Sequence, residues 1–590
     1  MDRRSTLSAM VGKLSSARTF KAPVLGGSLN PYTGPWTVRE AAHLLRRATF
    51  GPSQAQIDES VNLGLNGTIE KLFTENIGFP DPPVKWILDE PHPDRRYRRF
   101  IPYVDDPEVE YGETWINAKL LPRTGDQQRD IQIINYRQQS MLGWIFKLMN
   151  KNSMTIREKM TIFWHNHFVV AEFRIPKLIY QYINTIHQNV VGDFKQLTKD
   201  ITLDPSMLLY LNGAENTAAA PNENYARELL ELFTIGKGDL AGPGDYTNYT
   251  EDDVRAISRA LTGWTIDPGS LQGSEVDTLF AFFNHDIGRK QLSHRFKNAV
   301  ITNNGDKEYA DVIDIIFQQD EVSRFICRKL YRYFIHYNIT PQIETDVIEP
   351  MSQILRDNDY VIEPALRALL SSEHFYGEEA IGCMIKNPGD FHISLLKGMN
   401  FLFDGRNFLL SIPEGVIDGD LVDYYNSLVA YQMSADAGMA VYEHPDVAGW
   451  KAYYQAPTYY RTWINTFTLP IRTKHSAAMI AGGSITVANR EYDIDKIIPV
   501  LDIVNNIPGA EDPNELIHAL ARRFFPYGIT DGQKDFLKEI LIPGLPDFEW
   551  TVEYSDYLSD PDDRQKREAV ENRLRAMFSS LLEMPEAQLM

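Results

Sequence analysis

The chain has 590 residues, of which 43% are hydrophobic and 24% charged, and 59 Lys and Arg against 80 Asp and Glu give it a net charge of −21. This composition excludes a disordered protein, and no apolar run approaches the roughly 20 residues of a membrane-spanning helix. The excess of negative charge would repel a phosphate backbone, so we expect no nucleic-acid partner. The chain is therefore predicted to be soluble, acidic and folded.

Residues 1–36 predict a leader outside the packed domain. Arg3 and Arg4 stand as in a twin-arginine export signal, but Lys13 and a pair of serines interrupt the apolar segment that should follow them. The rest of the leader is rich in Gly and Pro, which is loop composition. Two interpretations stay open: a degenerate export signal on a periplasmic or exported protein, and a flexible leader on a cytoplasmic protein.

Residues 37–590 are predicted to form a helical domain, with a sub-boundary considered near residue 300. Thr37, Thr155 and Thr250 each stand three residues before an acidic residue, which is the capping-box pattern that opens a helix. The helix that follows Thr155 is expected to run to Val170. Apolar residues recur at three- to four-residue spacing, while the alternating runs typical of strands are scarce. We therefore predict a mostly α fold: a large multi-helical domain with long irregular loops and few or no strands.

An amphipathic helix is predicted from Asn222 to Thr234. Pro221 and Asn222 supply its start, and Gly236 supplies its stop. At about 100° per residue, its polar side chains lie on one face and its apolar side chains on the opposite face. The polar face is the part of this helix that could carry chemistry.

That polar face supports two interpretations. Arg227 can reach both Glu223 and Glu231 at four-residue spacing, which by itself indicates a ladder of surface ion pairs. Alternatively, Glu223 or Glu228 acts as an acid, a base or a metal ligand, and Arg227 and Asn224 orient it. The spacing of the residues is compatible with both.

Two histidines stand in an apolar stretch, with Asn166 between them. His165 and His167 would point about 160° apart on a regular helix, so they could not bind one metal ion there. A shared metal would require an extended or broken backbone. Three interpretations stay open: ligands of a divalent metal, core histidines with satisfied hydrogen bonds, or a catalytic histidine.

Two further polar pairs stand in apolar surroundings. His43 and Arg47 share one helix face at four-residue spacing. His285 and Asp286 follow two phenylalanines and could be a ligand pair, an acid–base pair or a turn. The sequence contains no motif for nucleotide binding, zinc peptidases, EF-hand calcium loops or GxSxG serine hydrolases, so these classes lose support.

A set of short motifs follows one another in a fixed order along the chain. They are RATFGP at 47–52, FWHNHF at 163–168, NENYARELLELFTIG at 222–236, YTEDDV at 249–254, RALTGW at 259–264, HD at 285–286, KNP at 386–388, PDVAGW at 445–450 and WIN at 463–465. Together they resemble the bacterial family called domain of unknown function 1800, over nearly the whole chain. The resemblance implies a mostly α-helical protein that is often exported and often encoded beside a relative of sulfatases and alkaline phosphatases. It implies no established reaction.

The resemblance adds weight to the polar residues of these motifs, and we expect them to converge on one buried polar site. The expected catalytic residues are Glu223, Glu228, Arg227, His165 and His167, and the expected binding residues are His43, Arg47, Asn166, Asn222, Asn224, His285 and Asp286. Glu223 or Glu228 would be the acid or base, and Arg227 would hold an anionic group. His165 or His167 would be a second proton carrier or a metal ligand.

Two functions are compatible with this set. The first is a hydrolase-like or lyase-like enzyme that acts on an anionic or carbohydrate substrate, with a divalent metal as a candidate cofactor. The second is a non-catalytic helical scaffold or export and assembly partner, in which the same residues form a buried network and the sulfatase- or phosphatase-related protein is the partner. An open pocket with unpaired polar groups favours the enzyme, whereas a closed and paired network favours the scaffold.

Overall fold

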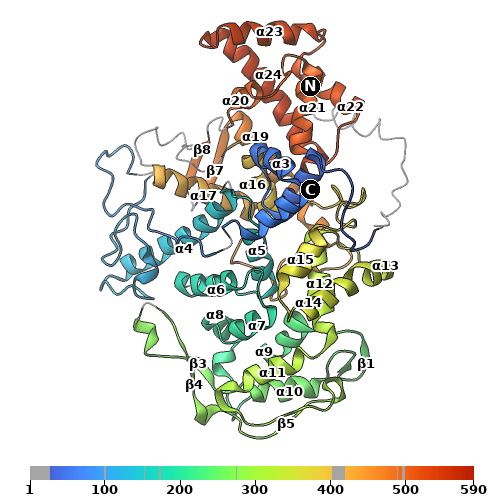
Figure 1. The fold of residues 1–590 in the computed structure, drawn as a ribbon. Helices are drawn as coiled ribbons and strands as arrows, with labels where there is room; N and C mark the ends of the chain where they lie inside the picture. Colours follow the sequence, from blue (N-terminus) through green and yellow to red (C-terminus); the bar gives the residue numbers. More distant parts are fainter. Residues whose placement is uncertain are drawn as a thin grey trace.

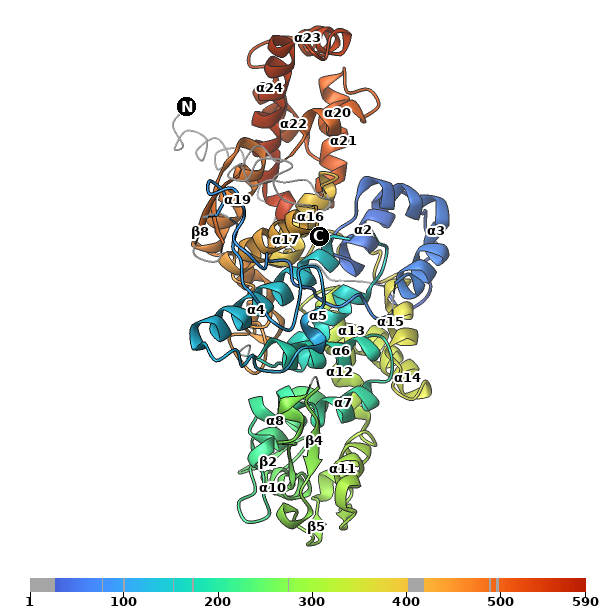
Figure 2. The ribbon, with the colours of Figure 1, turned by 90° about the vertical axis from the view of Figure 1, so that its left-hand side faces the viewer.

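The computed structural model describes residues 27–590, except 77, 99–100, 152, 172–174, 274, 402–418, 488–489 and 495–497. Most of the leader predicted for residues 1–36 therefore lies outside the described residues. The described chain forms an elongated molecule with helices arranged in three tiers along its long axis (Figure 1, Figure 2). We call these the lower, middle and upper tiers, in the orientation of Figure 1.

The middle tier combines helices from the first third of the chain with helices that follow residue 320 (Figure 1). The earlier helices are α2 (Val38–Ala48), α3 (Gln54–Thr74), α4 (Gln127–Asn150), α5 (Arg157–His167) and α6 (Pro176–Gln188). The later helices are α12 (Asp320–Phe334), α13 (Pro341–Ile343), α14 (Glu349–Asp357), α15 (Ile362–Leu370), α16 (Pro388–Gly398), α17 (Gly419–Asp436), α18 (Lys451–Tyr454) and α19 (Thr468–Ala481). Because α17 packs on both α4 and α16, distant parts of the sequence share this tier.

The lower tier is built from the central part of the chain and contains most of the strands (Figure 1). Its helices are α7 (Phe194–Thr202), α8 (Pro205–Tyr210), α9 (Asn224–Glu228), η3 (Leu229–Thr234), α10 (Glu251–Ala260) and α11 (Glu308–Ile316). Its strands are β1 (Leu240–Gly242), β2 (Asp245–Tyr246), β3 (Trp264–Ile266), β4 (Thr278–Phe280), β5 (Lys290–Gln291) and β6 (Val300–Ile301), which pair in sequence order as two-stranded antiparallel sheets. Between β4 and β5 lies the short 3-10 helix η5 (Phe282–Asn284).

The upper tier holds the last helices of the chain (Figure 1). They are α20 (Val500–Asn505), α21 (Pro513–Phe524), α22 (Asp531–Leu541), α23 (Phe548–Ser559) and α24 (Arg564–Glu583). The antiparallel pair β7 (Gly483–Val487) and β8 (Arg490–Ile494) follows α19 in the chain, and β7 contacts α17 and α19. Helix α24 contacts α19 as well as α22 and α23, so it joins the upper tier to the middle tier.

The capping boxes predicted at Thr37 and Thr250 are present. In each, the threonine hydroxyl accepts a backbone N–H, and the acidic side chain three residues later accepts the backbone N–H of the threonine. These reciprocal bonds satisfy donors that a helix start leaves without partners, and they open α2 and α10. The two starts were predictable because every group involved lies within four residues of sequence.

The box predicted at Thr155 is wrong. At the start of α5 the Thr155 hydroxyl accepts the backbone N–H of Arg157 (3.2 Å), but the reciprocal box does not form. The Glu158 carboxylate binds the Arg157 guanidinium (2.5 Å) instead of turning back to Thr155. Both charged side chains are buried, and a buried carboxylate is stabilised more by a paired cation than by one backbone N–H. The helix also ends at His167, short of the predicted Val170.

The predicted helix from Asn222 to Thr234 changes its hydrogen bonding midway, so the prediction of one regular helix is wrong. The α-helical part, α9, ends at Glu228, and η3 continues as a π-helix. The N–H groups of Ile235 and Gly236 both donate to the carbonyl of Leu230 (3.2 and 2.9 Å), and Gly236 ends the element with φ of +69°. Because a π-turn holds more residues than an α-turn, side chains after residue 229 leave the positions that 100° per residue gives them.

One hydrophobic cluster contains buried residues from Ala41 to Met590, in all three tiers. The predicted fold class is confirmed: helices dominate, and the strands form short antiparallel pairs. In the described part of the chain, no helix combines the length and apolar character that a membrane crossing requires. Cys327 and Cys383 are free thiols. The sub-boundary near residue 300 stays a prediction.

Candidate functional site

His43 and Arg47 lie on the buried face of α2, where they are 2% and 1% exposed. His43 donates from Nε2 to the carbonyl of Phe375 (3.0 Å). Arg47 donates from Nη1 to the carbonyls of Phe334 and Ile335 (both 3.3 Å), at the C-terminal end of α12. Carbonyls in the last turn of a helix have no partner within the helix, so Arg47 caps α12 from another part of the chain. Burial and the neighbouring Arg47 charge hold the pKa of His43 well below its ordinary value.

His165 lies in the interior of the middle tier with no exposed surface. Its Nε2 accepts the backbone N–H of Tyr442 (3.2 Å), and its Nδ1 lies 3.3 Å from the hydroxyl of Tyr182. That hydroxyl in turn donates to the carbonyl of Phe168 (2.5 Å). Burial lowers the pKa of His165 to about 3, so the ring is neutral at physiological pH. The ring of His444 stands 4.4 Å away, edge to face.

His167 binds the last turn of the element formed by α9 and η3, which lies in the motif at 222–236 and which we call the signature helix. It donates from Nε2 to the carbonyl of Phe233 (3.0 Å), and its Nδ1 accepts from Nζ of Lys329 (3.1 Å). Lys329 also donates to the carbonyl of Leu232 (2.8 Å), and burial lowers its pKa to about 7. The two side chains therefore cap the π-helical end of η3. His165 and His167 use different partners, as their spacing on a regular helix predicts.

The three candidate asparagines hold loops in place. Asn166 accepts the backbone N–H of Trp450 (2.9 Å), which joins the second and eighth of the ordered motifs. The backbone N–H of Asn222 donates to Oδ1 of Asn216 (2.8 Å), and Oδ1 of Asn222 accepts the backbone N–H of Asn224 (2.9 Å). These bonds shape the turn that leads into α9.

Arg227 forms ion pairs on the surface of the lower tier. Its guanidinium binds both oxygens of Glu251 (2.9 and 2.7 Å) and one oxygen of Glu223 (3.1 Å). The pairing with Glu223 was predicted, whereas the predicted pairing with Glu231 is wrong. Glu231 follows the change to π-helical bonding and accepts from the hydroxyl of Tyr249 (3.0 Å). The hydrogen bond to Glu251 raises the pKa of Arg227, which is therefore a permanent cation.

Glu228 differs from the other candidates because its half-buried side chain has no hydrogen bond within the described residues. Burial raises its pKa, and the nearby carboxylates of Glu231 and Asp446 raise it further, against the lowering effect of Arg227. Asp446 belongs to the PDVAGW motif at 445–450, so two motifs contribute carboxylates here. Of the predicted residues, Glu228 has the environment of an acid or base.

His285 belongs to a fully buried group of charged residues. Its ring lies between the carbonyl of Thr262 (2.8 Å from Nδ1) and the carboxylate of Glu308 (3.1 Å from Nε2). The ammonium of Lys290 binds the other oxygen of Glu308, and the side chains of all three residues have no exposed surface. The group ties β5 and α11 to the loop that follows β4.

Asp286 completes the anchoring of the same loop. Its carboxylate accepts from Nε of Arg259 (2.6 Å) and from the backbone N–H of Gly288 (2.7 Å). The bond to Arg259 lowers the pKa of Asp286, so the carboxylate is ionised and engaged. This geometry favours the interpretation of the His285–Asp286 pair as a structured turn.

The candidates therefore form several separate hydrogen-bonded groups. The structure brings His167 to the end of the signature helix, but His43 and Arg47 sit on α2 in the middle tier, away from α9 and α10 in the lower tier (Figure 1, Figure 2). Convergence of the full set on one reacting centre stays a prediction. Among the described residues, no group of three or more His, Cys, Asp or Glu side chains could hold a metal ion.

Some partners in these groups were not predicted. Glu251 stands in the motif at 249–254, but its pairing with Arg227 could not be predicted, because the two residues are 24 positions apart in sequence. Lys290, Glu308 and Lys329 lie outside the motifs, and their burial as charged residues is a property of the folded chain. A lysine or glutamate in an amphipathic sequence is ordinarily exposed, so no sequence signal marked them.

The hollows beside the candidates are small. One with about 310 Å³ of empty space, including its mouth, borders Asn222 and is lined mainly by apolar side chains. Polar groups on its wall are paired: the hydroxyls of Thr202 and Tyr225 lie 2.8 Å apart, and Asn216 binds Asn222. This site has the closed and paired character expected of structural polar groups.

Comparison with known proteins gives one family. A family model described as protein of unknown function (DUF1800) matches residues 43–589. No curated protein and no solved structure matches the chain.

Proposed function

The chain belongs to the DUF1800 family of proteins of unknown function, and we propose from its geometry that it is a non-catalytic helical scaffold that binds a protein partner. The observation that carries this proposal is that the buried motif residues hydrogen-bond to the backbone of other helices and loops. Arg47 and His167 cap the ends of helices that lie far away in the sequence, and His285 anchors a loop. Such contacts fix helix packing and bring no reactive group to an open cavity.

The anchored loop presents the surface that a partner would bind. Phe283 is 98% exposed and Phe282 is 52% exposed, and Leu279 and Ile287 beside them in the sequence are 47% and 60% exposed. The rings of the two phenylalanines contact each other edge to face at 6.1 Å. Exposed aromatic side chains that adjoin one another on a fixed backbone are typical of protein interfaces. We call these four residues the phenylalanine tip.

The backbone under the tip is held firmly. The carbonyl of Asn284 accepts the N–H of Ala218 (2.7 Å), and the N–H of Ala281 donates to the carbonyl of Gly263 (2.7 Å). The buried group around His285 secures the chain directly after the tip. A partner therefore meets a preformed surface and does not have to order it, which favours affinity.

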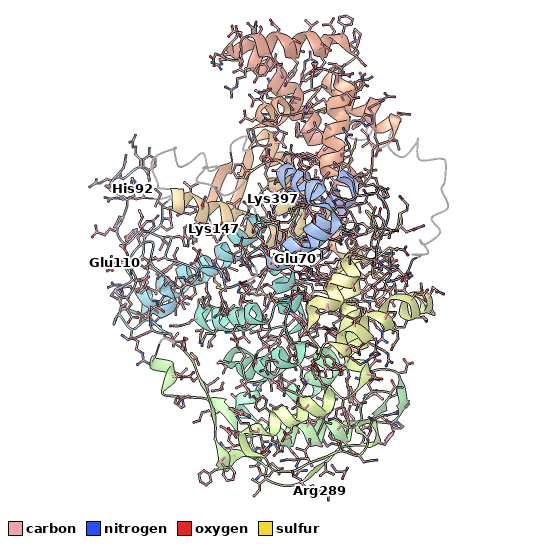
Figure 3. The ribbon with its side chains drawn as sticks, viewed as in Figure 1. Glu70, His92, Glu110, Lys147, Arg289 and Lys397 are labelled. Atoms are coloured by element: carbon pink, nitrogen blue, oxygen red, sulfur yellow. The ribbon has the colours of Figure 1, made fainter. Side chains whose placement is uncertain are left out.

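Charge complementarity points to an acidic partner surface. Residues 281–300 contain four basic residues, of which Lys290 is buried against Glu308 and Arg295 pairs with Asp245 (3.0 Å). Arg289 and Lys297 form no ion pair within the described residues, and Arg289 lies at the lower end of the molecule (Figure 3). From the family resemblance, the partner we propose is the sulfatase- or alkaline-phosphatase-related protein encoded nearby, through an acidic face.

Binding of the co-expressed neighbour protein by wild type and by the Phe282→Ser, Phe283→Ser double variant tests this proposal. Losing two central aromatic contacts should weaken binding by at least about tenfold. The matched control is Leu240→Ser, which removes another apolar side chain that is 68% exposed, on β1. Equal binding by the double variant, or no binding by wild type, would contradict the proposal.

A second candidate function rests on Glu228. Its raised pKa, and its lack of a hydrogen-bond partner in the part of the chain that the structure describes, support an acid–base role in a hydrolase-like or lyase-like reaction on an anionic or carbohydrate substrate. Arg227 would contribute less than the sequence suggested, because Glu251 already binds both of its terminal nitrogens. Lys237, which lies 3.4 Å from Glu231, is the cation on this surface that would meet an anionic substrate.

A hydrolase and lyase screen with wild type and Glu228→Gln tests the second candidate. If Glu228 is the proton donor, activity falls by at least about a hundredfold in the variant, and the alkaline limb of its pH profile disappears, while the unfolding free energy changes little. Asp252→Asn on the exposed start of α10 is the control. Activity that survives in Glu228→Gln would exclude this role.

Export to the periplasm or the cell surface is proposed from the family resemblance, with the cytoplasm as the alternative, and cell fractionation would decide between them.

A further inference from the structure

A pocket between α2, α16 and α21 is lined by cations. It has about 390 Å³ of empty space, including its mouth, and its polar lining residues are Arg46, Lys386, Ser394 and Arg523. The described residues that line it include no carboxylate. The three helices lie side by side in Figure 2, close to the C-terminus. Arg46 and Lys386 come from two of the ordered motif regions, next to RATFGP and in KNP.

The cations retain donors that the protein does not use. Arg46 is 6% exposed, and within the described residues it donates only from Nη2, to the carbonyls of Arg522 (3.2 Å) and Arg523 (3.0 Å) at the end of α21. Lys386 is 7% exposed and donates from Nζ only to the carbonyl of Ala587 (2.9 Å). Arg523 donates from Nη2 to Asn400 (2.8 Å), and its buried Nε has no partner among the residues that the structure describes. A buried charged donor without an acceptor is costly, so Nε of Arg523 marks a position where an acceptor would be stabilised.

The neighbouring carboxylate does not compensate this charge. Asp390 is bound by Nζ of Lys159 (2.5 Å) and by Nδ2 of Asn387 (2.7 Å). The guanidinium of Arg472, with no exposed surface, adds a further cation on the other side of Lys386. The interior here therefore has more cations than carboxylates, although the whole chain is strongly acidic. An anion in the pocket would restore the balance.

The acid–base behaviour of these groups agrees with uncompensated positive charge. Burial lowers the pKa of Arg46 to about 10. Burial, followed by repulsion from Arg46, lowers the pKa of Lys386 to about 7, in spite of the attraction to Asp390. Burial also lowers the pKa of Arg523 to about 10, against a weak opposing effect of Asp58. Each shift has the sign expected for a cation that has lost water and gained no full partner.

We propose that this pocket is a binding site for a tetrahedral oxyanion, a phosphate or sulfate group. The unused edge of the Arg46 guanidinium and Nε of Arg523 would donate to its oxygens, Lys386 would supply a point charge, and the Ser394 hydroxyl would complete the wall. Guanidinium forks match such oxygens in pairs, and charge-assisted hydrogen bonds of this kind are strong in a site shielded from water. The site is separate from the phenylalanine tip and from Glu228, because none of its lining residues belongs to either surface.

Calorimetric titration with inorganic phosphate and with sulfate, at constant ionic strength set by chloride, tests the proposal. Wild type should bind both ions, and Arg46→Gln and Arg523→Gln should each weaken binding by at least about tenfold. If Arg46→Gln fails to fold because α21 loses its cap, Arg523→Gln still tests the proposal, since Arg523 is only partly buried. Arg39→Gln is the control, since Arg39 also lies on α2 but pairs with the exposed Glu378.

The pH dependence of sulfate binding separates a ligand site from a purely structural cluster. Lys386 faces Arg46 from α2, Asp390 from α16 and Arg472 from α19, and sulfate keeps its charge throughout. Binding should strengthen as the pH falls from about 8 to about 6, because Lys386 gains its proton, and Lys386→Met should remove this dependence. Glycerol phosphate serves as a third probe: binding equal to that of phosphate indicates an ester group of a larger molecule, and weaker binding indicates the free ion. Absence of binding by wild type, or unchanged affinity in both arginine variants, would overturn the proposal.

Discussion

Replacing Glu308 by Gln should destabilise the protein strongly, because the Glu308 carboxylate is the counterion of a fully buried group. Its two oxygens bind Nε2 of His285 (3.1 Å) and the ammonium of Lys290, and all three side chains have no exposed surface. A neutral amide in place of this carboxylate would leave Lys290 without a counterion, and the carbonyl of Asp286 would be its remaining acceptor. Breaking a buried ion pair in this way costs about 3–5 kcal/mol.

The assay is urea unfolding followed by circular dichroism, with Glu378→Gln as the control. Glu378 also pairs with a cation, Arg39, but its side chain is 73% exposed, so its loss should cost less than about 1 kcal/mol. Amide hydrogen exchange at residues 281–289 should also rise in Glu308→Gln, because the loop loses its anchor. A loss of stability below about 1 kcal/mol in Glu308→Gln, equal to that of the control, would refute the reasoning that this group holds the loop.

Two further predictions concern groups that the fold buries without partners or space. Both ring nitrogens of His187 are buried and form no hydrogen bond with a described residue, and burial lowers the pKa of His187 to about 3. Between that value and the ordinary pKa of about 6.5, the unfolded chain binds a proton that the folded chain does not, so stability is lost as the pH falls below 6.5. His187→Phe keeps a ring in place and removes the titrating group, so the drop in unfolding free energy between pH 7 and pH 5 should be smaller in the variant by roughly 2 kcal/mol. Urea unfolding at the two pH values measures this drop, and equal drops for wild type and variant would count against a buried neutral His187. Gly449 has φ of +87°, and a Cβ there would stand 2.3 Å from Oδ1 and 2.7 Å from the backbone oxygen of Asn166, so Gly449→Ala should lower the unfolding free energy by several kcal/mol. The control Gly544→Ala, with φ of +64° and open space around it, should cost about 1 kcal/mol. Similar losses of stability for the two variants would disprove a tight contact at Asn166.

The sequence predicts those parts of the fold that depend on nearby residues. The boxes at Thr37 and Thr250 and the helix stop at Gly236 are examples, because each is decided within a few positions. The box at Thr155 fails because Glu158 is buried beside Arg157, and burial is a tertiary property. Local patterns therefore predict where many helices begin and end.

The candidate site could be predicted only in part, because its contacts cross long stretches of sequence. The motifs identified His167 and the signature helix, and the structure joins them through the carbonyl of Phe233. Lys329 stands in no motif, yet it caps the same turn, and it lies 162 positions from His167. The motifs single out polar residues, but their spacing does not distinguish a cap from a catalyst, because both require a polar group held in a fixed place.

The central claim is that the buried motif residues maintain the packing of the helices. Urea unfolding of the His165→Ala, His167→Ala double variant tests it most directly. The substitutions remove two buried rings, together with the acceptor of the Tyr442 N–H and the donor to the Phe233 carbonyl. The account predicts a loss of at least about 4 kcal/mol of unfolding free energy, or failure to fold. A double variant that unfolds at the same urea concentration as wild type would contradict the account and make the two histidines candidates for a direct functional role again.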